Sequence, residues 1–254
     1  MMADTGRIEV SIVVPVYRNR ETLAPLCERL SASLAAAGID RREIILVDDA
    51  SPDGAWSEIR ALAKRRGEVH GIRLGQNAGQ HLAVLTGMCV AQGAIVVAMD
   101  GDLQDLPEAV PRLIAALNGS DVVFAGRRGV YQGWGATLTS LVYRHAVLRH
   151  IGLPVGAGMF FAMSRTTRDR ILAYPFHKGS VIGLIGAGSV AVSAPHARDK
   201  RAVGRSSYTF RSRLRAARRV VTSWRLAQRT LSGRLGGAAP SFRTVLPGAI
   251  AEQI

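Results

Sequence analysis

Residues 94–105 have the sequence AIVVAMDGDLQD, an apolar run that stops abruptly at a group of acids. The run is β-branched at positions 95–97, which favours a strand buried on both faces. Strands of this kind are typical of the inside of a parallel sheet. The acids therefore follow the carboxyl end of a strand, and this is the edge at which open α/β sheets bind their ligands.

Two of these carboxylates are separated by one glycine. In extended geometry Asp100 and Asp102 point the same way, and they repel each other unless a cation or hydrogen-bond donors lie between them. A divalent metal would meet this need, and Gln104 continues the spacing with a neutral oxygen. Hard oxygen ligands suit Mg²⁺ or Mn²⁺ shared with substrate phosphates. The alternative is a polar turn, which Asp and Gly also form, and these residues alone favour neither.

The composition fits one folded α/β domain with an appendage. The chain has 254 residues, 48% of them hydrophobic, which allows a large core. Cys27 and Cys89 form no metal-binding spacing, and this favours a reduced, cytosolic setting. Residues 1–7 are polar and do not resemble a signal peptide. The longest apolar stretch, 181–195, is broken by glycines and too short for a bilayer, so we expect no transmembrane helix.

Strands and helices alternate along the chain. Apolar runs predict strands at 10–17, 44–47, 69–74, 94–99 and 121–125, with helices at 21–37, 55–66, 79–91 and 107–117. Further along, we predict helices at 134–151, 166–174 and 181–187 and strands at 159–163 and 190–194. This alternation favours a parallel sheet with right-handed crossovers. The turn at 15–21 contains no glycine, so the dinucleotide-binding fingerprint is absent there.

The positive charge is concentrated in one segment. The net charge is +14, and residues 198–234 contain twelve Lys and Arg residues but one acid, Asp199. This implies an anionic surface or anionic substrates for that segment. A helix is predicted over 208–231 with an apolar stripe formed by Phe210, Leu214, Ala217, Val221 and Trp224. Such a helix is typical of a membrane interface. The alternative is that the apolar stripe packs on the main domain and leaves a solvated basic face.

Four short motifs occur in order at or after the ends of predicted strands: VVPVY at 13–17, VDDASPDG at 47–54, NAGQ at 77–80 and DGDLQ at 100–104. With these motifs the chain resembles the family 2 glycosyltransferases of the GT-A fold, in particular the branch of dolichol-phosphate mannose synthase and polyprenyl-phosphate glycosyltransferases. The resemblance extends over residues 8–232. It implies an α/β fold with a mostly parallel central sheet flanked by helices, a Rossmann-like nucleotide-sugar domain.

The resemblance also implies how the donor is bound. Pro15, Tyr17 and Val47 are expected to line the nucleotide pocket, with Asp49 accepting a hydrogen bond from the base. For the Asp48–Asp49 pair the alternative is a helix N-cap, a role that Ser51 or Asp53 could also fill.

The same resemblance assigns the metal and the phosphates. It implies that Asp102 and Gln104 hold Mg²⁺ or Mn²⁺ on the donor diphosphate, with Asp100 beside the sugar and ribose. Arg127 is placed like the family's phosphate-binding arginine, and Asp100, Asp102 and Arg127 are the expected catalytic residues; the alternative for Arg127 is a solvated loop residue. Residues 201–208 resemble a loop that folds over the diphosphate, with Arg201 or Arg205 meeting phosphate.

Departures from the family pattern bear on the substrate. Asn19 stands where a glutamate is common in the nucleotide pocket, and Ser207 stands where a lysine is common. Residues 159–162 are apolar where the family usually has an Asp and an Arg, so we expect an acceptor side that differs from that of the mannose enzymes.

The chain is therefore predicted to be a metal-dependent inverting glycosyltransferase with a nucleotide-sugar donor. The expected acceptor is a polyprenyl phosphate or another lipid-linked, cell-envelope glycan, whose anionic phosphate needs no general base. A hydroxyl acceptor would need one, and only Asp105 and Glu108 are weak candidates. His81 is expected to pack or to form a local hydrogen bond.

We expect a GT-A catalytic domain at 1–206, a basic amphipathic helix at 207–232 and a flexible tail at 233–254. A cytoplasmic protein lying peripherally at the inner face of the cell membrane is predicted, with no nucleic-acid partner. Three other classes of protein remain as alternatives. A nucleotidyltransferase would need a glycine-rich basic loop after the first strand, a nucleic-acid-binding protein would leave both acid clusters unexplained, and an inactive transferase would fit the altered segment at 159–162. The oligomeric state stays open.

Overall fold

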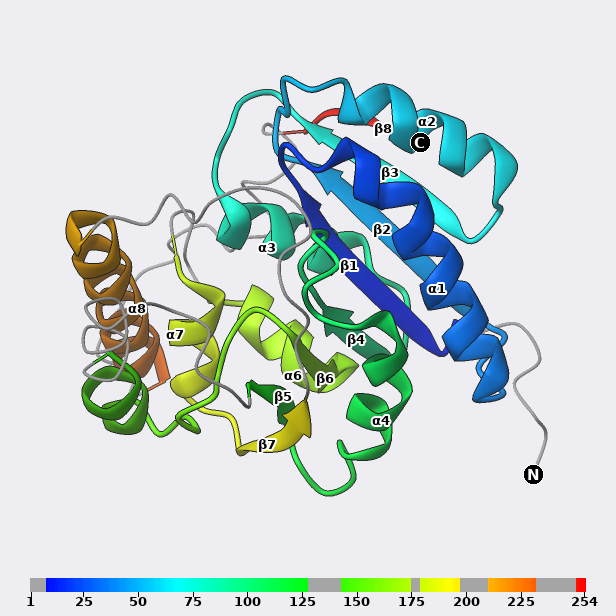
Figure 1. The fold of residues 1–254 in the computed structure, drawn as a ribbon. Coiled ribbons are helices and arrows are strands. Elements are labelled where there is room, and N and C mark those ends of the chain that lie inside the picture. Colours follow the sequence, from blue (N-terminus) through cyan, green and yellow to red (C-terminus); the bar gives the residue numbers. More distant parts are fainter. Residues whose placement is uncertain (1–7, 128–142, 175–178, 197–209, 232–249) are drawn as a thin grey trace.

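A computed structural model describes residues 8–127, 143–174, 179–196, 210–231 and 250–254. Within these ranges the chain forms one sheet in the order β7-β5-β6-β4-β1-β2-β3-β8 (Figure 1). The strands are β1 (Val10–Val16), β2 (Arg42–Asp48), β3 (Val69–Leu74), β4 (Ile95–Ala98), β5 (Val122–Arg127), β6 (Phe161–Ser164), β7 (Ala191–His196) and β8 (Ile250–Gln253).

Most neighbouring strands are parallel, as the alternation of strands and helices predicts. β1 pairs in parallel with β2 and β4, β2 with β3, and β5 with β7. β6 is antiparallel to both β4 and β5, and β8 is antiparallel to β3. The mostly parallel α/β sheet that we predicted is therefore confirmed.

Helices cover both faces of the sheet. They are α1 (Leu23–Ala36), α2 (Ala55–Arg65), α3 (Gln80–Val90), α4 (Val110–Ala115), α6 (Arg165–Leu172), α7 (Val181–Gly186) and α8 (Phe210–Leu231), with short η1 (Arg20–Thr22), η2 (Pro107–Ala109) and η3 (Tyr143–Leu148). Of the helix predicted at 134–151, residues 134–142 lie outside the described ranges.

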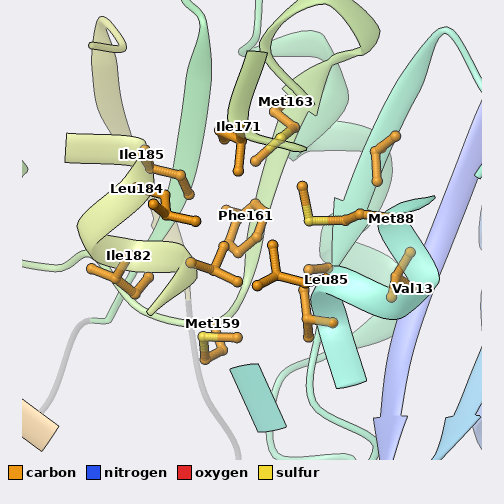
Figure 2. Packing of buried hydrophobic residues seen from close by; sticks show 14 of the residues in the cluster. Val13, Leu85, Met88, Met159, Phe161, Met163, Ile171, Ile182, Leu184 and Ile185 are labelled. Carbon is orange, nitrogen blue, oxygen red and sulfur yellow. The ribbon is translucent and has the colours of Figure 1, made fainter. Parts of the chain in front are cut away.

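Each face of the sheet has its own core. Ile12 and Val14 of β1 pack with α1, α2 and α4, whereas Val13 between them packs with α3, α6 and α7. Figure 2 shows the second core, in which Phe161 of β6 lies between side chains of α3 and α7. Burial on both faces explains why these strands are continuous apolar runs in the sequence.

The helix predicted at 208–231 is present as α8, and it packs on the body of the protein. Among the α8 residues whose burial is described, Val220, Ser223 and Ala227 are buried, and α8 meets α7 at Val220 and Ser223. A Cβ added at Gly183 of α7 would lie 2.8 Å from the Cβ of Ser223, so the two backbones approach closely.

The residues of α8 that make this contact are not those of the predicted apolar stripe. Trp224 is only partly buried and meets the ring of His150 edge to face, with ring centroids 5.2 Å apart, and Val221 is also partly exposed. A stripe drawn through large apolar residues misses Ser223 and Ala227, whose small side chains permit the close approach. The packed alternative therefore describes this part of α8. No helix among the described residues is long and apolar enough to cross a bilayer.

The flexible tail predicted at 233–254 is wrong for its last residues. β8 pairs with β3, and Ile254 exchanges backbone hydrogen bonds with Gly71 at 2.8 and 2.9 Å. The indole Nε1 of Trp56 in α2 donates to Glu252 at 2.8 Å. These residues add a strand at β3, which would otherwise form the edge of the sheet. The short segment IAEQ has no sequence pattern that predicts this pairing.

Candidate active site

The loops after β1, β2 and β4 meet at one edge of the sheet. β1 lies between β2 and β4, so the chain order reverses at β1. Ligands of open α/β sheets bind at such a switch point, beyond the carboxyl ends of the strands. The first, second and fourth sequence motifs lie at the carboxyl ends of these three strands or in the loops that follow them.

The backbone is strained in the same three loops. Among the described residues, the non-glycine residues with positive φ are Arg18 (56°), Ala50 (52°) and Leu103 (59°). Each follows a different one of the three strands. Such conformations persist only where the surroundings enforce them, and they cluster at functional sites.

The acidic loop after β4 is held from two sides. Gln80, the first residue of α3, donates from its side-chain amide to Oδ1 of Asp100. The backbone N–H of Gln104 donates to Oδ1 of Asp102 at 3.1 Å, and the hydroxyl of Thr22 contacts the carbonyl of Gly101.

Asn19 packs against the glycine between the two acids. Any Cβ at Gly101 would collide with the carboxamide nitrogen of Asn19, whose oxygen accepts from the N–H of Tyr17 at 2.9 Å. The residue that stands in place of the family's glutamate thus joins the β1 loop to the acidic loop.

The donor set of the acidic loop fits a hard divalent cation that is shared with a substrate. Asp100, Asp102 and Gln104 are all partly exposed and offer two carboxylates and one amide oxygen. No group of three or more His, Cys, Asp or Glu side chains suited to a metal occurs in the described residues. Mg²⁺ is usually bound by one or two carboxylates together with substrate phosphates, so these residues fit such a metal.

Asp49, at the start of the loop after β2, is buried and hydrogen-bonded to the loop that precedes α3. Asp49 is 3% exposed and accepts from the N–H groups of Ala78 at 2.6 Å and Gly79 at 2.9 Å. Burial raises the pKa of Asp49, while these two hydrogen bonds lower it, and the net shift is upward. Both carboxylate oxygens thus hold the 77–80 loop, and a contact to a base stays a prediction.

Asp48 and Asp53 have structural partners. Asp48 accepts from the N–H of Ser51 at 2.8 Å and lies 3.5 Å from Nε of Arg73. Burial raises the pKa of Asp48. Asp53 accepts from the N–H of Ala55 at 3.2 Å, in the first turn of α2, and from that of Arg20 at 3.0 Å. The N-cap of α2 is Gly54, with no side-chain capping hydrogen bond, so Asp53 precedes the cap and instead links the first turn of α2 to Arg20.

The predicted walls of the nucleotide pocket differ in accessibility. Tyr17 is 44% exposed and Pro15 is partly buried, so both are open to a ligand. Val47 is 0% exposed, because it lies inside a central strand and packs against Gly87 of α3. Val47 therefore presents no surface to a ligand in this structure, which corrects our expectation for it.

Residues 11–172 match the family model described as "Glycosyl transferase family 2". The chain belongs to this family. Curated family 2 relatives include an undecaprenyl-phosphate 4-deoxy-4-formamido-L-arabinose transferase of Enterobacter sp. (strain 638), 32% identical over 209 residues, which cover 80% of this chain and 63% of the relative. Its counterpart in Aeromonas hydrophila is 37% identical over 146 residues, 57% of this chain and 44% of the relative. The chain thus spans roughly half the length of these relatives.

Solved structures confirm the GT-A fold. A mannosyltransferase of Pyrobaculum calidifontis in complex with GDP-Man and Mn²⁺ superposes with a TM-score of 0.60 at 20% identity, covering 96% of this chain and 69% of that one. A glucosyl-3-phosphoglycerate synthase of Mycobacterium tuberculosis, in complex with Mn²⁺, UDP and phosphoglyceric acid, gives 0.59 at 23% identity and covers 86% and 77%.

The remaining family 2 positions are described only in part. Arg127 ends β5, with its backbone paired to His196 of β7, and its side chain lies outside the description. Arg201 and Arg205 lie outside the described residues, in the range 197–209. The predicted end of the catalytic domain at residue 206 lies in the same range.

Neither candidate base, Asp105 or Glu108, is placed to take a proton from a hydroxyl acceptor. Glu108 forms two hydrogen bonds of 2.7 Å with Arg29. The Arg29 contact lowers the pKa of Glu108, which weakens it as a base. Asp105 is 1% exposed. His81 packs as expected, but its buried Nδ1 has no hydrogen-bond partner in the described part of the chain.

Sequence reasoning gave no role to Gln80 or Thr22, although both touch the acidic loop. Gln80 lies in the NAGQ motif, which was the available signal. Thr22 belongs to no motif, and its contact with Gly101 spans 79 positions of the chain.

Proposed function

We propose that this chain is a metal-dependent inverting glycosyltransferase that moves a sugar from a nucleotide-sugar donor to a lipid-linked acceptor, a polyprenyl phosphate. The observation that carries the proposal is the acid pair Asp100 and Asp102, with Gln104, at the switch point of a family 2 sheet. The acceptor class is supported by relatives that are named as undecaprenyl-phosphate sugar transferases and that match up to 80% of this chain.

Asp102 and Gln104 are proposed to hold Mg²⁺ or Mn²⁺, and Asp100 to face the sugar and ribose. When bound, the metal supplies positive charge that stabilises the departing diphosphate. Arg127 at the end of β5, with Arg201 or Arg205, is proposed to bind phosphate, because guanidinium groups bind it bidentately. Pro15 and Tyr17 are proposed to contact the nucleotide, and Asp49 to shape its site through the 77–80 loop.

The proposed reaction is a single displacement. A phosphate oxygen of the acceptor attacks the anomeric carbon from the side opposite the diphosphate. The new carbon–oxygen bond forms as the bond to the diphosphate oxygen breaks, and that oxygen keeps the electron pair. The products are a nucleoside diphosphate and a sugar on the lipid phosphate with inverted configuration. No base is needed, since the attacking oxygen is already anionic. This agrees with the ion pair that engages Glu108.

A soluble hydroxyl acceptor is the second candidate. It would need a carboxylate that can take a proton at the acceptor oxygen. Asp105 is buried and Glu108 is bonded to Arg29, so neither is placed for this role, and the lipid phosphate is favoured.

We further propose that the protein lies peripherally on an anionic membrane through α8. Arg218, Arg219 and Arg225 are exposed on this helix, while Val220 and Ala227 are buried against the body. The contact is therefore electrostatic, through arginines, and needs no insertion of the apolar side.

The proposal is tested first on the donor. UDP-, GDP- and dTDP-sugars are assayed for binding and hydrolysis with Mn²⁺ or Mg²⁺, with EDTA and Asp102→Ala as controls. We expect one nucleotide to be selected, and selection to be lost with EDTA and in the variant. Full activity of Asp102→Ala would refute the proposed metal role, and no binding of any donor would refute the transferase.

The acceptor is tested with the selected donor. Transfer to a short polyprenyl phosphate is compared with transfer to the matching polyprenol, which has a hydroxyl in place of the phosphate. We expect product only with the phosphate. Product with the polyprenol alone would move the proposal to a hydroxyl acceptor.

A further inference from the structure

One short loop joins the two acid clusters of the site. The carboxylate of Asp49, after β2, accepts from the N–H groups of Ala78 and Gly79. The next residue, Gln80, donates its side-chain amide to Asp100, after β4. Hydrogen bonds and adjacent peptide bonds thus connect Asp49 to Asp100 through residues 78–80.

The loop has little freedom to move. Gly79 has φ 89° and ψ 156°, a region that is essentially restricted to glycine, and this turn directs its N–H to Asp49 just before α3 begins. Further along α3, a Cβ at Gly87 would collide with Val13 of β1 and lie 3.1 Å from Val47 of β2. The helix that carries Gln80 is therefore seated directly on the two central strands.

The contact fixes a carboxylate next to the proposed metal and sugar. A side-chain amide donates a hydrogen bond without adding a charge, so it restricts Asp100 while leaving the acid's charge in place. Reacting groups must be held to a fraction of an ångström, and a misplacement of about 1 Å can lower a rate on the order of a hundredfold.

We propose that Gln80 is a positioning residue for the transfer step. Its amide orients Asp100, and the hydrogen bonds of Asp49 to the same loop make that orientation depend on the nucleotide end of the site. This inference rests on the proposed function, since it concerns how the same site aligns its donor.

The first test separates hydrogen bonding from space filling. Glutamate has the shape of glutamine but replaces the donor with a charge that repels Asp100, whereas leucine only removes the donor. We expect kcat to fall about ten- to hundredfold in Gln80→Leu, the loss of one hydrogen bond to a charged group, and further in Gln80→Glu. A milder effect in Gln80→Glu than in Gln80→Leu would overturn the proposal.

Binding gives a readout that does not depend on turnover. We expect the Kd of the nucleoside diphosphate with Mn²⁺, measured by calorimetry, to change little in Gln80→Leu, because the substitution leaves the proposed metal ligands Asp102 and Gln104 and the proposed nucleotide contacts unchanged. Gln76→Leu is the matched control, since Gln76 is exposed in the same connection, and it should leave kcat and Kd at wild-type values. A Gln80→Leu variant that binds the nucleotide more weakly but keeps the wild-type kcat would contradict a role in aligning the sugar.

The link to Asp49 is tested by a double-mutant cycle. Residues in one hydrogen-bond network give non-additive effects, whereas independent sites add. We expect kcat of Asp49→Asn with Gln80→Leu to be no lower than that of the worse single variant. Additive losses would refute the link. An inactive wild type with every donor would refute the proposed function and this inference together; an active wild type with Gln80 variants equal to Gln76→Leu would refute the inference alone.

Discussion

Gly183 of α7 meets the backbone of α8 at Val220, so closely that a Cβ at Gly183 would lie within 3.0 Å of the Val220 carbonyl oxygen. The hydroxyl of Ser223, in the next turn of α8, accepts from the N–H of Ser180 at 2.8 Å and donates to the carbonyl of Arg219 at 2.7 Å. α8 is thus held by a tight contact between small residues and by a buried hydroxyl.

We expect Gly183→Ala to destabilise the protein, because the added methyl group forces α7 and α8 apart. Overpacking of this kind costs about 1–3 kcal/mol, measured as a fall in the free energy of unfolding in urea. Gly67→Ala is the control, since a Cβ there meets nothing within 4 Å. Equal stability of the two variants would show that α8 is not docked on α7.

Thr22→Val tests the support of the acidic loop. The Thr22 hydroxyl lies 2.8 Å from the carbonyl oxygen of Asn19 and contacts that of Gly101, and valine keeps the shape without the donor. We expect a loss of about 0.5–1.5 kcal/mol in stability and weaker metal-dependent donor binding, measured by calorimetry. Thr222→Val removes a hydroxyl that donates to the carbonyl of Arg218 at an exposed position of α8, and it should leave donor binding unchanged. Weaker donor binding in this variant too would argue against a local effect at Thr22.

The strand ends were predictable because of how parallel sheets bury their strands. β1, β2 and β4 are apolar runs that end at polar motifs, and the ends of parallel strands meet at one edge. The sequence alone therefore places the acidic loop after β4 at the same edge of the sheet as the Asp48–Asp49 loop after β2.

The other features of the fold and the site depend on contacts between distant parts of the chain, which leave no local pattern in the sequence. β6 lies between β4 and β5, an insertion that strand periodicity does not encode. β8 joins the sheet through backbone pairing, and Gln80 reaches Asp100 only because α3 is seated on the sheet at Gly87. The burial of Val47 follows from the central place of β2, which a motif match does not reveal.

His81 is expected to make stability depend on pH. Burial, with the nearby charge of Arg219, lowers the pKa of His81 to about 4, against about 6.5 in the unfolded chain. Between these values the unfolded state binds a proton that the folded state does not, so stability falls as the pH is lowered from about 6.5 to 4.

The measurement compares wild type with His81→Phe across this window. On going from pH 7 to pH 4, wild type should lose up to about 3 kcal/mol more than the variant. Above about pH 8 the histidine is neutral in both states, so the difference between the two proteins should be constant there. If the free energies of unfolding of the two proteins differ by the same amount at every pH, His81 takes up its proton as readily in the folded state as in the unfolded state.

The exposed arginines of α8 are expected to govern membrane binding. Each is worth about 1 kcal/mol near an anionic surface, so Arg218→Gln with Arg225→Gln should weaken binding to phosphatidylglycerol vesicles about thirtyfold at low salt. Arg60→Gln with Lys64→Gln makes the same charge change on α2, which lies across the molecule from α8 (Figure 1), and should bind as wild type does. Substitutions keep α8 in place, whereas truncation would expose its buried side. Binding is measured as the fraction of protein that floats with the vesicles. An equal fraction for both double variants, or one that does not depend on salt, would contradict docking through α8.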